Sequence, residues 1–405
     1  MEKSTSFFTF RQSQYLTQEE VLETKRQRHS ITIGLPAEDK SKENRIALTP
    51  QGVEILSTNG HKIIIEKGAG DGANYFDNEF SEAGAIIVDS KEEVYKQSEV
   101  ILKITPPTLS EIELLNQGQL LMSFFYISHQ DNNSFLKLAS RRINALGFEF
   151  LKNDLNEYPV IRTISEIEGY TSVLLASEYL NKSNGGKGVL LGGITGVPPS
   201  SVVIIGANTA GEFATRAALG LGCQVKVFDN SYKRLRDIEK NVGQRLYTSM
   251  LHPQSLNKAL QTADAVIASL RAVDSGKVFI TKEQISKMKR GAVIVDLSVG
   301  EVGCFETEKS DYFSNEPFID EYGVIQCATL NLSSRVSKTA SIALSNIFTP
   351  ILLELGEHVD IHSLIKQNRT IANGTYIYKG ILTNREIGER FSLPYNDIGL
   401  LLSAF

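Results

Sequence analysis

Residues 202–229 read VVIIGANTAGEFATRAALGLGCQVKVFD, and this stretch constrains the fold more than any other part of the chain. It predicts a strand, a glycine-containing turn, a helix and a second strand that ends in an acid. Strands that alternate with helices in this way form a parallel sheet, so the chain is expected to be an α/β protein.

The turn reads G-A-N-T-A-G, with Gly206 and Gly211 at the first and third positions of a dinucleotide fingerprint and Asn208 at the second. The first glycine makes the tight turn, the second lets the backbone approach pyrophosphate, and the third lets the helix pack on the strand. Asparagine tolerates positive φ better than most residues. The turn is therefore expected to form, with the Asn208 side chain either swinging aside or contacting the ligand.

The second strand ends at Asp229, where a carboxylate can accept hydrogen bonds from ribose hydroxyls. Its charge would repel a 2′-phosphate, so NAD is favoured over NADP. An ordinary turn with an aspartate at the strand end is the alternative interpretation. The candidate cofactor-binding residues of this unit are Gly206, Asn208, Thr209, Ala210, Gly211, Asp229 and Asn230.

The 405 residues, 41% of them hydrophobic, are enough for two domains with separate cores. Residues 31–150 alternate short β-rich runs with helix-like segments, and a second such set runs from SVVIIG to GVIQCATL. A helical pattern from about residue 164 to 180 and a glycine-rich connector separate the two sets. We predict an N-terminal extension over 1–29, a first domain made of 30–163 and 337–405, and a central Rossmann domain over 164–336.

Composition limits the cellular partners. The net charge is −5 and the lysines and arginines are scattered, which argues against nucleic acid. The three cysteines form no CxxC pair, as is typical of reduced intracellular proteins. The N-terminus lacks a signal-peptide core, and no stretch approaches the ~20 apolar residues of a membrane span. We expect a cytoplasmic protein with no membrane partner, in which residues 15–28 form an exposed helix of unassigned function.

Four stretches together resemble the family of alanine dehydrogenase and the NAD-binding subunit of proton-translocating transhydrogenase. They are KENRIALTPQGVEILSTNGHKIIIEKGAGDGANY, GKGVLLGGITGVPPSSVVIIGANTAG, KRGAVIVDLSVGEVGCFET and NGTYIYKGILTNREIGERFSLPY. The resemblance spans roughly residues 31–395. The transhydrogenase subunits carry an Arg, Gln, Asp loop that has no matching glutamine in YPVIRTISEIEGYTS, so the alanine dehydrogenase branch is favoured.

The resemblance implies two Rossmann-like, doubly wound domains, the first discontinuous, that are joined by long helices and separated by a cleft. NAD would bind the central domain. The outer domain would bind a small amino or keto acid. A homo-oligomer, either a hexamer or a dimer, is the expected assembly.

The oxidation of an amino acid needs a cation for the carboxylate, a donor for the developing keto oxygen and an acid/base group. Arg45, in ENRIALTP, matches the family's substrate-carboxylate arginine, and its planar fork can bind a carboxylate through two hydrogen bonds. A structural or surface ion pair is the alternative. The family's KVKEP reads KITPP here, which retains Lys103 but has Thr105 in place of the second, substrate-contacting lysine.

The acid/base positions depart further from the family pattern. Tyr126 aligns with the catalytic histidine, and Gly300 aligns with the catalytic aspartate. Tyrosine titrates near ~10, far from the near-neutral pKa that suits proton transfer. The candidate substitutes are Lys103 as an oxyanion donor and His129 or Glu301 for proton transfer. A strand-end surface lysine, a loop histidine and a solvated carboxylate are the respective alternatives.

The resemblance also assigns cofactor contacts outside the glycine turn. Ser165 matches a serine near the cofactor, although it could instead cap the long helix. Ser269 and Leu270 would pass beneath the adenosine ribose, and Asn331 matches an asparagine beside the nicotinamide.

The leading functional hypothesis is an NAD-dependent amino acid dehydrogenase that converts L-alanine, NAD and water to pyruvate, ammonia and NADH. An opine- or saccharopine-like dehydrogenase that acts on another amino or keto acid is the first alternative. A regulator that binds NAD(H) without hydride chemistry is the second. The retained arginine favours dehydrogenation of alanine, whereas the substituted histidine, aspartate and lysine favour the alternatives.

Overall fold

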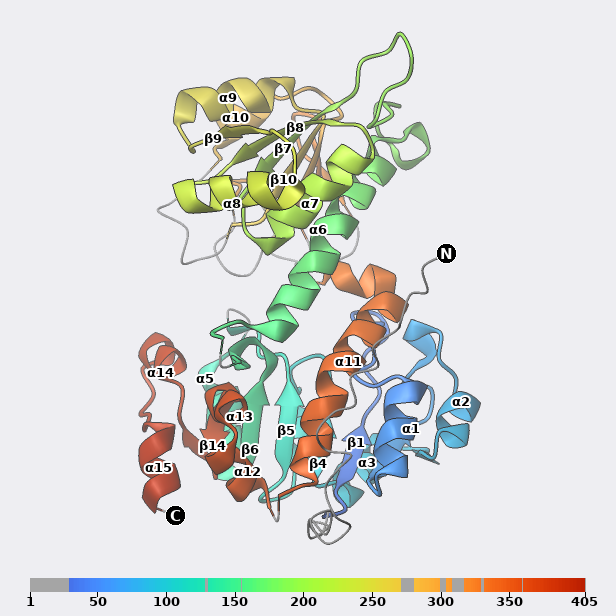
Figure 1. The fold of residues 1–405 in the computed structure, drawn as a ribbon, viewed down its shortest axis with the longest axis vertical. Coiled ribbons are helices and arrows are strands. Elements are labelled where there is room, and N and C mark those ends of the chain that lie inside the picture. The colour runs from blue at the N-terminus through green and yellow to red at the C-terminus, as the bar shows by residue number, and fades with distance from the viewer. Residues whose placement is uncertain are drawn as a thin grey trace, which may run out of the picture.

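The computed structural model describes residues 29–127, 130–153, 155–270, 280–298, 304–307, 317–328, 331–358 and 360–404. Two sheets flanked by helices lie one above the other, and the long helix α6 (Pro159–Leu180) runs from one to the other (Figure 1). The α/β fold with two Rossmann-like domains is therefore confirmed. The predicted extension over residues 1–29, with its helix at 15–28, lies outside the described residues except for His29.

The outer sheet has eight strands in the order β15-β14-β6-β5-β4-β1-β2-β3. Its first six strands in sequence are parallel and take the arrangement 3-2-1-4-5-6 of doubly wound folds, whereas β14 and β15 pair antiparallel at one edge. The strands are β1 (Thr32–Leu35), β2 (Lys62–Glu66), β3 (Ile86–Val88), β4 (Val100–Leu102), β5 (Leu120–Ser123), β6 (Asn144–Gly147), β14 (Thr375–Tyr378) and β15 (Ile381–Leu382). Because β14 and β15 come from the C-terminal part of the chain, this domain is discontinuous.

Helices cover both faces of the outer sheet, which is why its central strands are continuous apolar runs such as VIL in β4. The helices of this domain are α1 (Pro50–Thr58), α2 (Asp77–Glu82), α3 (Lys91–Gln97), α4 (Leu109–Leu114), α5 (Asn132–Ser140), α11 (Ser337–Leu355), α12 (Ile361–Gln367), α13 (Arg369–Gly374), α14 (Arg385–Phe391) and α15 (Ile398–Ala404).

The central sheet has seven strands in the order β12-β13-β11-β10-β7-β8-β9, and only β12 is antiparallel. Its six parallel strands repeat the 3-2-1-4-5-6 arrangement. The strands are β7 (Ser201–Ile205), β8 (Gln224–Phe228), β9 (Tyr247–Ser249), β10 (Ala265–Ala268), β11 (Val293–Asp296), β12 (Phe318–Ile319) and β13 (Ile325–Ala328). The helices are α7 (Thr209–Gly220), α8 (Tyr232–Val242), α9 (Pro253–Thr262) and α10 (Lys282–Ser286).

Helix α6 begins earlier than the pattern from residue 164 predicted, because Pro159 occupies its first turn, where a missing N–H costs nothing. Ser165 lies inside this helix and is buried, so the interpretation of Ser165 as a helix cap is wrong. Helix α6 packs closely on α7, since a Cβ added to Gly169 would lie 2.4 Å from the Ala210 carbonyl oxygen. Residue 164 thus falls within a continuous helix, and the division into domains at 164 and 337 stays a prediction.

One stretch in the described part of the chain, Leu332–Leu355, is long and apolar enough by length and composition to cross a membrane. The sequence-based statement that no stretch approaches a membrane span is therefore wrong. This stretch consists of η7 (Leu332–Val336) and α11, which packs on α1 and α6. Buried serines of α11 accept hydrogen bonds from the loop before α1, at 2.9 Å from the Ile46 N–H to Ser341 and 3.1 Å from the Thr49 N–H to Ser345.

Candidate functional site

The two sheets reverse their strand order at the pairs β1/β4 and β7/β10. Ligands of doubly wound folds bind in the crevice beyond the carboxyl ends of the strands at such a reversal. Most of the candidate residues that the structure describes follow the carboxyl ends of strands in one sheet or the other. They are Arg45 after β1, Lys103 after β4, Tyr126 after β5, the glycine turn after β7, Asp229 and Asn230 after β8, Ser269 and Leu270 after β10, and Asn331 after β13.

Arg45 is buried, with only 1% of its side chain exposed, so the alternative of a surface ion pair is wrong. Its guanidinium donates to both oxygens of the Glu43 carboxylate, at 2.8 Å from Nε and 2.7 Å from Nη2, and Nη1 donates to Ser333 Oγ at 2.9 Å. Burial disfavours the charge, but the Glu43 carboxylate outweighs it, and the pKa of Arg45 is raised. The fork that the sequence assigned to a substrate carboxylate thus binds a carboxylate of the chain itself.

Glu43 joins the two halves of the chain at this point. Besides Arg45, its carboxylate accepts a hydrogen bond at 2.7 Å from Nδ2 of Asn331, the predicted nicotinamide neighbour. The same amide nitrogen donates to the Lys42 carbonyl oxygen at 3.0 Å, and the Asn44 N–H donates to Ser334 Oγ at 2.8 Å. Burial raises the pKa of Glu43, but the charge of Arg45 more than compensates and the net pKa is lowered. The charged pair and these hydrogen bonds therefore hold the loop over residues 42–45 against the segment that follows β13.

Tyr126 has a left-handed backbone, with φ of 47°, and its ring stacks on Phe124 at 5.3 Å. The Phe125 and Tyr126 N–H groups both donate to Oε1 of Glu149, at 2.8 and 2.7 Å, and hold this unusual turn. Burial raises the pKa of Tyr126 although the nearby Arg45 opposes the rise. The phenol therefore stays protonated at neutral pH, where it can donate a hydrogen bond but cannot act as a base.

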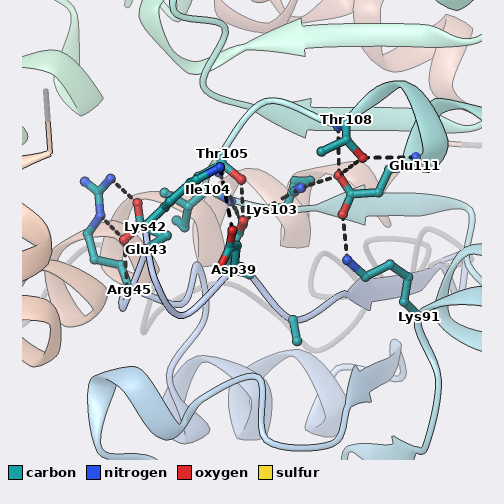
Figure 2. A network of polar contacts seen from close by, with 12 residues as sticks. Asp39, Lys42, Glu43, Arg45, Lys91, Lys103, Ile104, Thr105, Thr108 and Glu111 are labelled. Atoms are coloured by element: carbon teal, nitrogen blue, oxygen red, sulfur yellow. Dashed lines mark hydrogen bonds and ion pairs between the residues drawn. The ribbon is translucent and has the colours of Figure 1, made fainter. Parts of the chain in front are cut away.

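Lys103 is buried at the end of β4, so the alternative of a strand-end surface lysine is wrong. Figure 2 shows its ammonium bonded to Glu111 of α4, at 3.0 Å to Oε2, and Glu111 also binds Lys91 at 2.8 Å. Burial raises the pKa of Glu111, but the two lysines and the Thr108 backbone lower it to about 2. Lys103 therefore has a partner that is ionised at neutral pH.

Glu38 lies on the other side of Lys103, with 3.7 Å between Oε2 and the lysine nitrogen. Its Oε1 accepts hydrogen bonds from the Ile104 N–H at 2.5 Å and the Thr105 N–H at 3.2 Å, and its Oε2 accepts one from the Thr105 hydroxyl. Burial raises the pKa of Glu38 even though Lys103 and Thr105 oppose the rise. Glu38, Arg45 and Lys103 line one cavity of about 10 Å³, which is room for about one water molecule.

The glycine turn of the central sheet is tight. Gly206 has φ of 106°, and a Cβ added to Gly211 would lie 1.8 Å from the Gly206 carbonyl oxygen. Asn208 has φ of −82°, so the expectation that asparagine is tolerated here for its positive φ is wrong. Instead its side chain swings aside and caps α7, because Oδ1 accepts from the Gly211 N–H at 3.1 Å while Nδ2 donates to the Ser269 carbonyl.

Asp229 is buried beside this turn, and its carboxylate accepts hydrogen bonds from the Ala207 and Ser231 N–H groups, each at 2.7 Å. Each carboxylate oxygen can accept a further hydrogen bond. Arg234 lies 3.8 Å away, and Asn230 is exposed.

The remaining cofactor candidates surround the same turn. Ser269 is buried and its hydroxyl donates to the Gly206 carbonyl at 3.2 Å, while Leu270 is buried next to it. Thr209 and Ala210 are the first two residues of α7, where backbone N–H groups and the helix dipole favour an anion.

Two candidates for proton transfer, His129 and Glu301, lie outside the described residues, as does Gly300. Their assignments stay predictions. Sequence reasoning missed Glu38, Glu43 and Glu149, which contact the predicted site residues. Glu43 is two positions before Arg45 and Glu38 follows β1, so adjacency to candidate residues is the signal that could have found both.

Models of protein families match almost the whole described chain. The alanine dehydrogenase/PNT N-terminal domain matches residues 34–168, and the alanine dehydrogenase/PNT C-terminal domain matches residues 172–385. The chain belongs to the alanine dehydrogenase/PNT family. The resemblance seen in the four sequence stretches is thereby confirmed.

Individual relatives agree with this assignment. Alanine dehydrogenase 2 of Staphylococcus aureus is 32% identical over 370 residues, which cover 91% of this chain and 98% of the relative. A solved L-alanine dehydrogenase superposes with a TM-score of 0.82 at 28% identity, and the match covers 89% of this chain and 99% of that one. A transhydrogenase from Sinorhizobium meliloti, at 20% identity and a TM-score of 0.73, shares the fold. The family uses NAD(H), in agreement with the predicted cofactor.

Proposed function

We propose that this chain is an NAD-dependent amino acid dehydrogenase of the alanine dehydrogenase type, which interconverts L-alanine and pyruvate. The observation that supports this most is the buried Arg45. Its guanidinium lies in the crevice of the outer sheet and bonds to Ser333, while its partner Glu43 bonds to Asn331. A cation suited to an α-carboxylate is thus tied to the segment proposed to border the nicotinamide.

The central sheet offers a fitting site for NAD. Glycine at positions 206 and 211 allows a tight turn, because a Cβ there would clash with Ser269 or with the Gly206 carbonyl oxygen, and α7 begins at this turn, where backbone N–H groups favour a pyrophosphate. Asp229 would accept hydrogen bonds from ribose hydroxyls. Ser269 and Leu270 would border the adenosine ribose, Asn331 would border the nicotinamide, and Ser165 would lie near the cofactor. When bound, NAD supplies the acceptor for the hydride that leaves the substrate.

The residues of the outer domain would prepare the substrate. An incoming α-carboxylate would replace Glu43 at the Arg45 fork, an exchange of one carboxylate for another that keeps the buried cation paired. Tyr126, which holds its proton, would donate a hydrogen bond to the developing keto oxygen. Lys103 would support that oxygen electrostatically from its position between two carboxylates.

A specific observation favours the second candidate, an NAD(H)-binding regulator. Tyr126 occupies the position of the family's histidine with a pKa raised further from neutrality, and Arg45 already has a carboxylate partner. An opine- or saccharopine-like dehydrogenase, which would couple an amino acid to a keto acid, is the third candidate.

Spectroscopy of NADH separates the three. The purified chain is incubated with NAD and L-alanine at alkaline pH, then with NADH, pyruvate and ammonia, and finally with other amino and keto acids in pairs. We expect turnover with alanine and pyruvate. We also expect a loss of at least ~10²-fold in kcat/KM in Arg45→Lys, because lysine cannot form the paired hydrogen bonds, with NADH affinity unchanged. NADH binding without turnover of any substrate would establish the regulator instead.

The assembly and location are proposals of the same kind. We expect a homo-oligomer, either a hexamer or a dimer, in the cytoplasm, with small-molecule amino and keto acids as its ligands. Sedimentation at micromolar concentration would distinguish a hexamer from a dimer or a monomer.

A further inference from the structure

Glu38 occupies the point in the outer domain where a substrate is expected. It lies three residues beyond the end of β1, and Lys103 and Thr105 follow the end of β4, the neighbouring strand at the reversal of strand order. Its carboxylate accepts three hydrogen bonds from this β4 loop, namely from the backbone of Ile104 and from the backbone and hydroxyl of Thr105. The carboxylate is therefore fixed in orientation by the chain segment that aligns with the family's substrate-contacting lysine.

The charges around Glu38 leave its own charge incompletely balanced. Thr105 is neutral where the family pattern has a second lysine. The ammonium of Lys103 lies closer to Glu111, at 3.0 Å, than to Glu38, at 3.7 Å. Two carboxylates thus share this ammonium, and Lys91 contacts only Glu111 of the two. Because a buried carboxylate without a full counter-charge binds a proton more readily, the raised pKa of Glu38 agrees with this geometry.

Glu38 also lines the same cavity as the predicted substrate arginine. The cavity that it lines is shared with Arg45 and Lys103, and its remaining walls are mostly apolar, including Ala47 and Ala69. Glu43 and Glu111, the other buried carboxylates nearby, do not line it. An α-amino acid carries its carboxylate and its ammonium on one carbon atom, so a cation and a carboxylate on one cavity match both groups.

We propose that Glu38 is the base that accepts the proton of the substrate's α-ammonium group, in place of the family's histidine. This inference rests on the proposed function. In the step, an N–H bond of the ammonium breaks and an O–H bond forms at Glu38, while the nitrogen keeps the electron pair. That lone pair then forms the carbon–nitrogen double bond as the hydride leaves Cα, and in the reverse direction Glu38 returns the proton. Because the cavity has room for about one water molecule, its side chains must move apart to admit the amino acid.

The test compares Glu38→Gln and Glu38→Asp with the control Glu111→Gln, which removes the other carboxylate from Lys103 without altering the cavity wall. A base must be unprotonated to act, so kcat/KM for the amino acid should rise with pH through the pKa of Glu38 in the wild type. In Glu38→Gln, kcat/KM should fall by about 10²- to 10⁴-fold at neutral pH and should then follow only the fraction of substrate that already carries a free amine. Glu38→Asp should recover part of the activity. Glu111→Gln should keep a pH-dependent limb, displaced toward lower pH because Lys103 then has Glu38 as its one remaining carboxylate partner of the two.

The affinities for pyruvate and L-alanine test the role of Glu38 independently of turnover. With NADH present, Glu38→Gln should bind pyruvate within about threefold of the wild type but should bind L-alanine at least about tenfold more weakly, because only alanine has an ammonium group. An unchanged pH limb in Glu38→Gln, or equal losses in Glu38→Gln and Glu111→Gln, overturns the role of Glu38 and leaves the proposed function standing. A wild-type chain that turns over no amino acid overturns the proposed function. In that case, weaker alanine binding by Glu38→Gln would still show that Glu38 recognises the ammonium group, and unchanged binding would exclude this role. A wild type that binds neither ligand overturns both.

Discussion

The Glu43 carboxylate receives two parallel hydrogen bonds from the Arg45 guanidinium, at 2.8 and 2.7 Å, and both side chains are almost completely buried. Such a pair is costly to break from one side, because the remaining partner keeps a buried charge without a counter-charge. The pair therefore stabilises the loop over residues 42–45. Under the proposed function, a substrate carboxylate would also have to compete with Glu43 for Arg45.

Removal of Glu43 tests the first consequence. Glu43→Ala is expected to lower the free energy of unfolding by about 3–5 kcal/mol, since it leaves the Arg45 charge buried and unmatched. Glu43→Gln should cost less, because the amide oxygen still accepts one hydrogen bond from the guanidinium. Urea denaturation followed by circular dichroism measures both, and equal stability of Glu43→Ala and the wild type would contradict the structural role.

Acid should lower the free energy of unfolding, because Glu111 becomes protonated. Its folded-state pKa of about 2 lies below the ordinary value of 4.5, so its stabilising contribution is complete above pH 4.5 and is lost as the pH falls toward 2. The contribution is at most roughly 3 kcal/mol. Urea midpoints recorded from pH 7 to pH 3 should show the difference between the wild type and Glu111→Gln shrinking with acid. A difference that is constant over this range would exclude the linkage.

The glycine turn provides a matched pair of substitutions. Gly211→Ala should weaken NADH binding at least about tenfold, because the new Cβ meets the Gly206 carbonyl oxygen at 1.8 Å and the turn must open. Gly220→Ala, at the other end of the same helix, adds a Cβ with no heavy atom within 4 Å, and its NADH affinity should match the wild type. Fluorescence titration with NADH compares the two, and similar affinities would argue against this turn as the pyrophosphate site.

Asn208 should matter for the helix more than for the cofactor. Asn208→Ala removes the cap of α7 and is expected to cost about 1 kcal/mol, whereas Asn208→Gly should cost only a few tenths. The glycine variant should bind NADH at least as tightly as the wild type, since it restores a bare backbone at the second position of the fingerprint. Weaker NADH binding by the glycine variant would instead make the Asn208 side chain a direct contact of the cofactor.

Tyr126→His should raise kcat/KM for alanine at neutral pH by about tenfold or more, because imidazole titrates near neutrality and would supply a proton-transfer group in addition to Glu38, whereas the tyrosine pKa is raised away from neutrality. The left-handed backbone at this position also suits histidine, which adopts positive φ more readily than most residues. Tyr126→Phe removes only the hydroxyl and should lower kcat. Steady-state assays of the three proteins decide the matter, and an inactive histidine variant with normal NADH binding would count against residue 126 as a site of proton transfer.

The strands, the glycine turn and the fold class could be predicted from the sequence, because each depends on a local residue pattern. Buried parallel strands such as β7 and β10 are continuous apolar runs, and the turn between β7 and α7 has its own residue signature, so the two-domain fold followed from the sequence. The start of α6 was placed late because Pro159 interrupts the apolar pattern while remaining compatible with a first helical turn.

The partners of the site residues depend on tertiary contacts and were not predicted. Lys103 meets Glu111 and Tyr126 meets Glu149 only after separate loops converge at the edge of the outer sheet. Asn208 was expected to be tolerated because asparagine adopts positive φ readily. In the structure its φ is negative, its side chain caps α7, and the residue of the turn with positive φ is Gly206. Chemical identity of a residue was readable from the sequence, but the electrostatic surroundings that set its proton affinity were not.

Helix α6 runs without interruption from Pro159 to Leu180 between the two crevices. An α-helix of 22 residues is a stiff rod about 33 Å long. Helix α6 contacts elements of both halves of the molecule. Under the proposed function, closure around a substrate would therefore have to pivot at the ends of α6 or bend it. Substitutions along α6, although remote from the reacting atoms, would then change the turnover rate, because they would change how often the two crevices come close enough for hydride transfer.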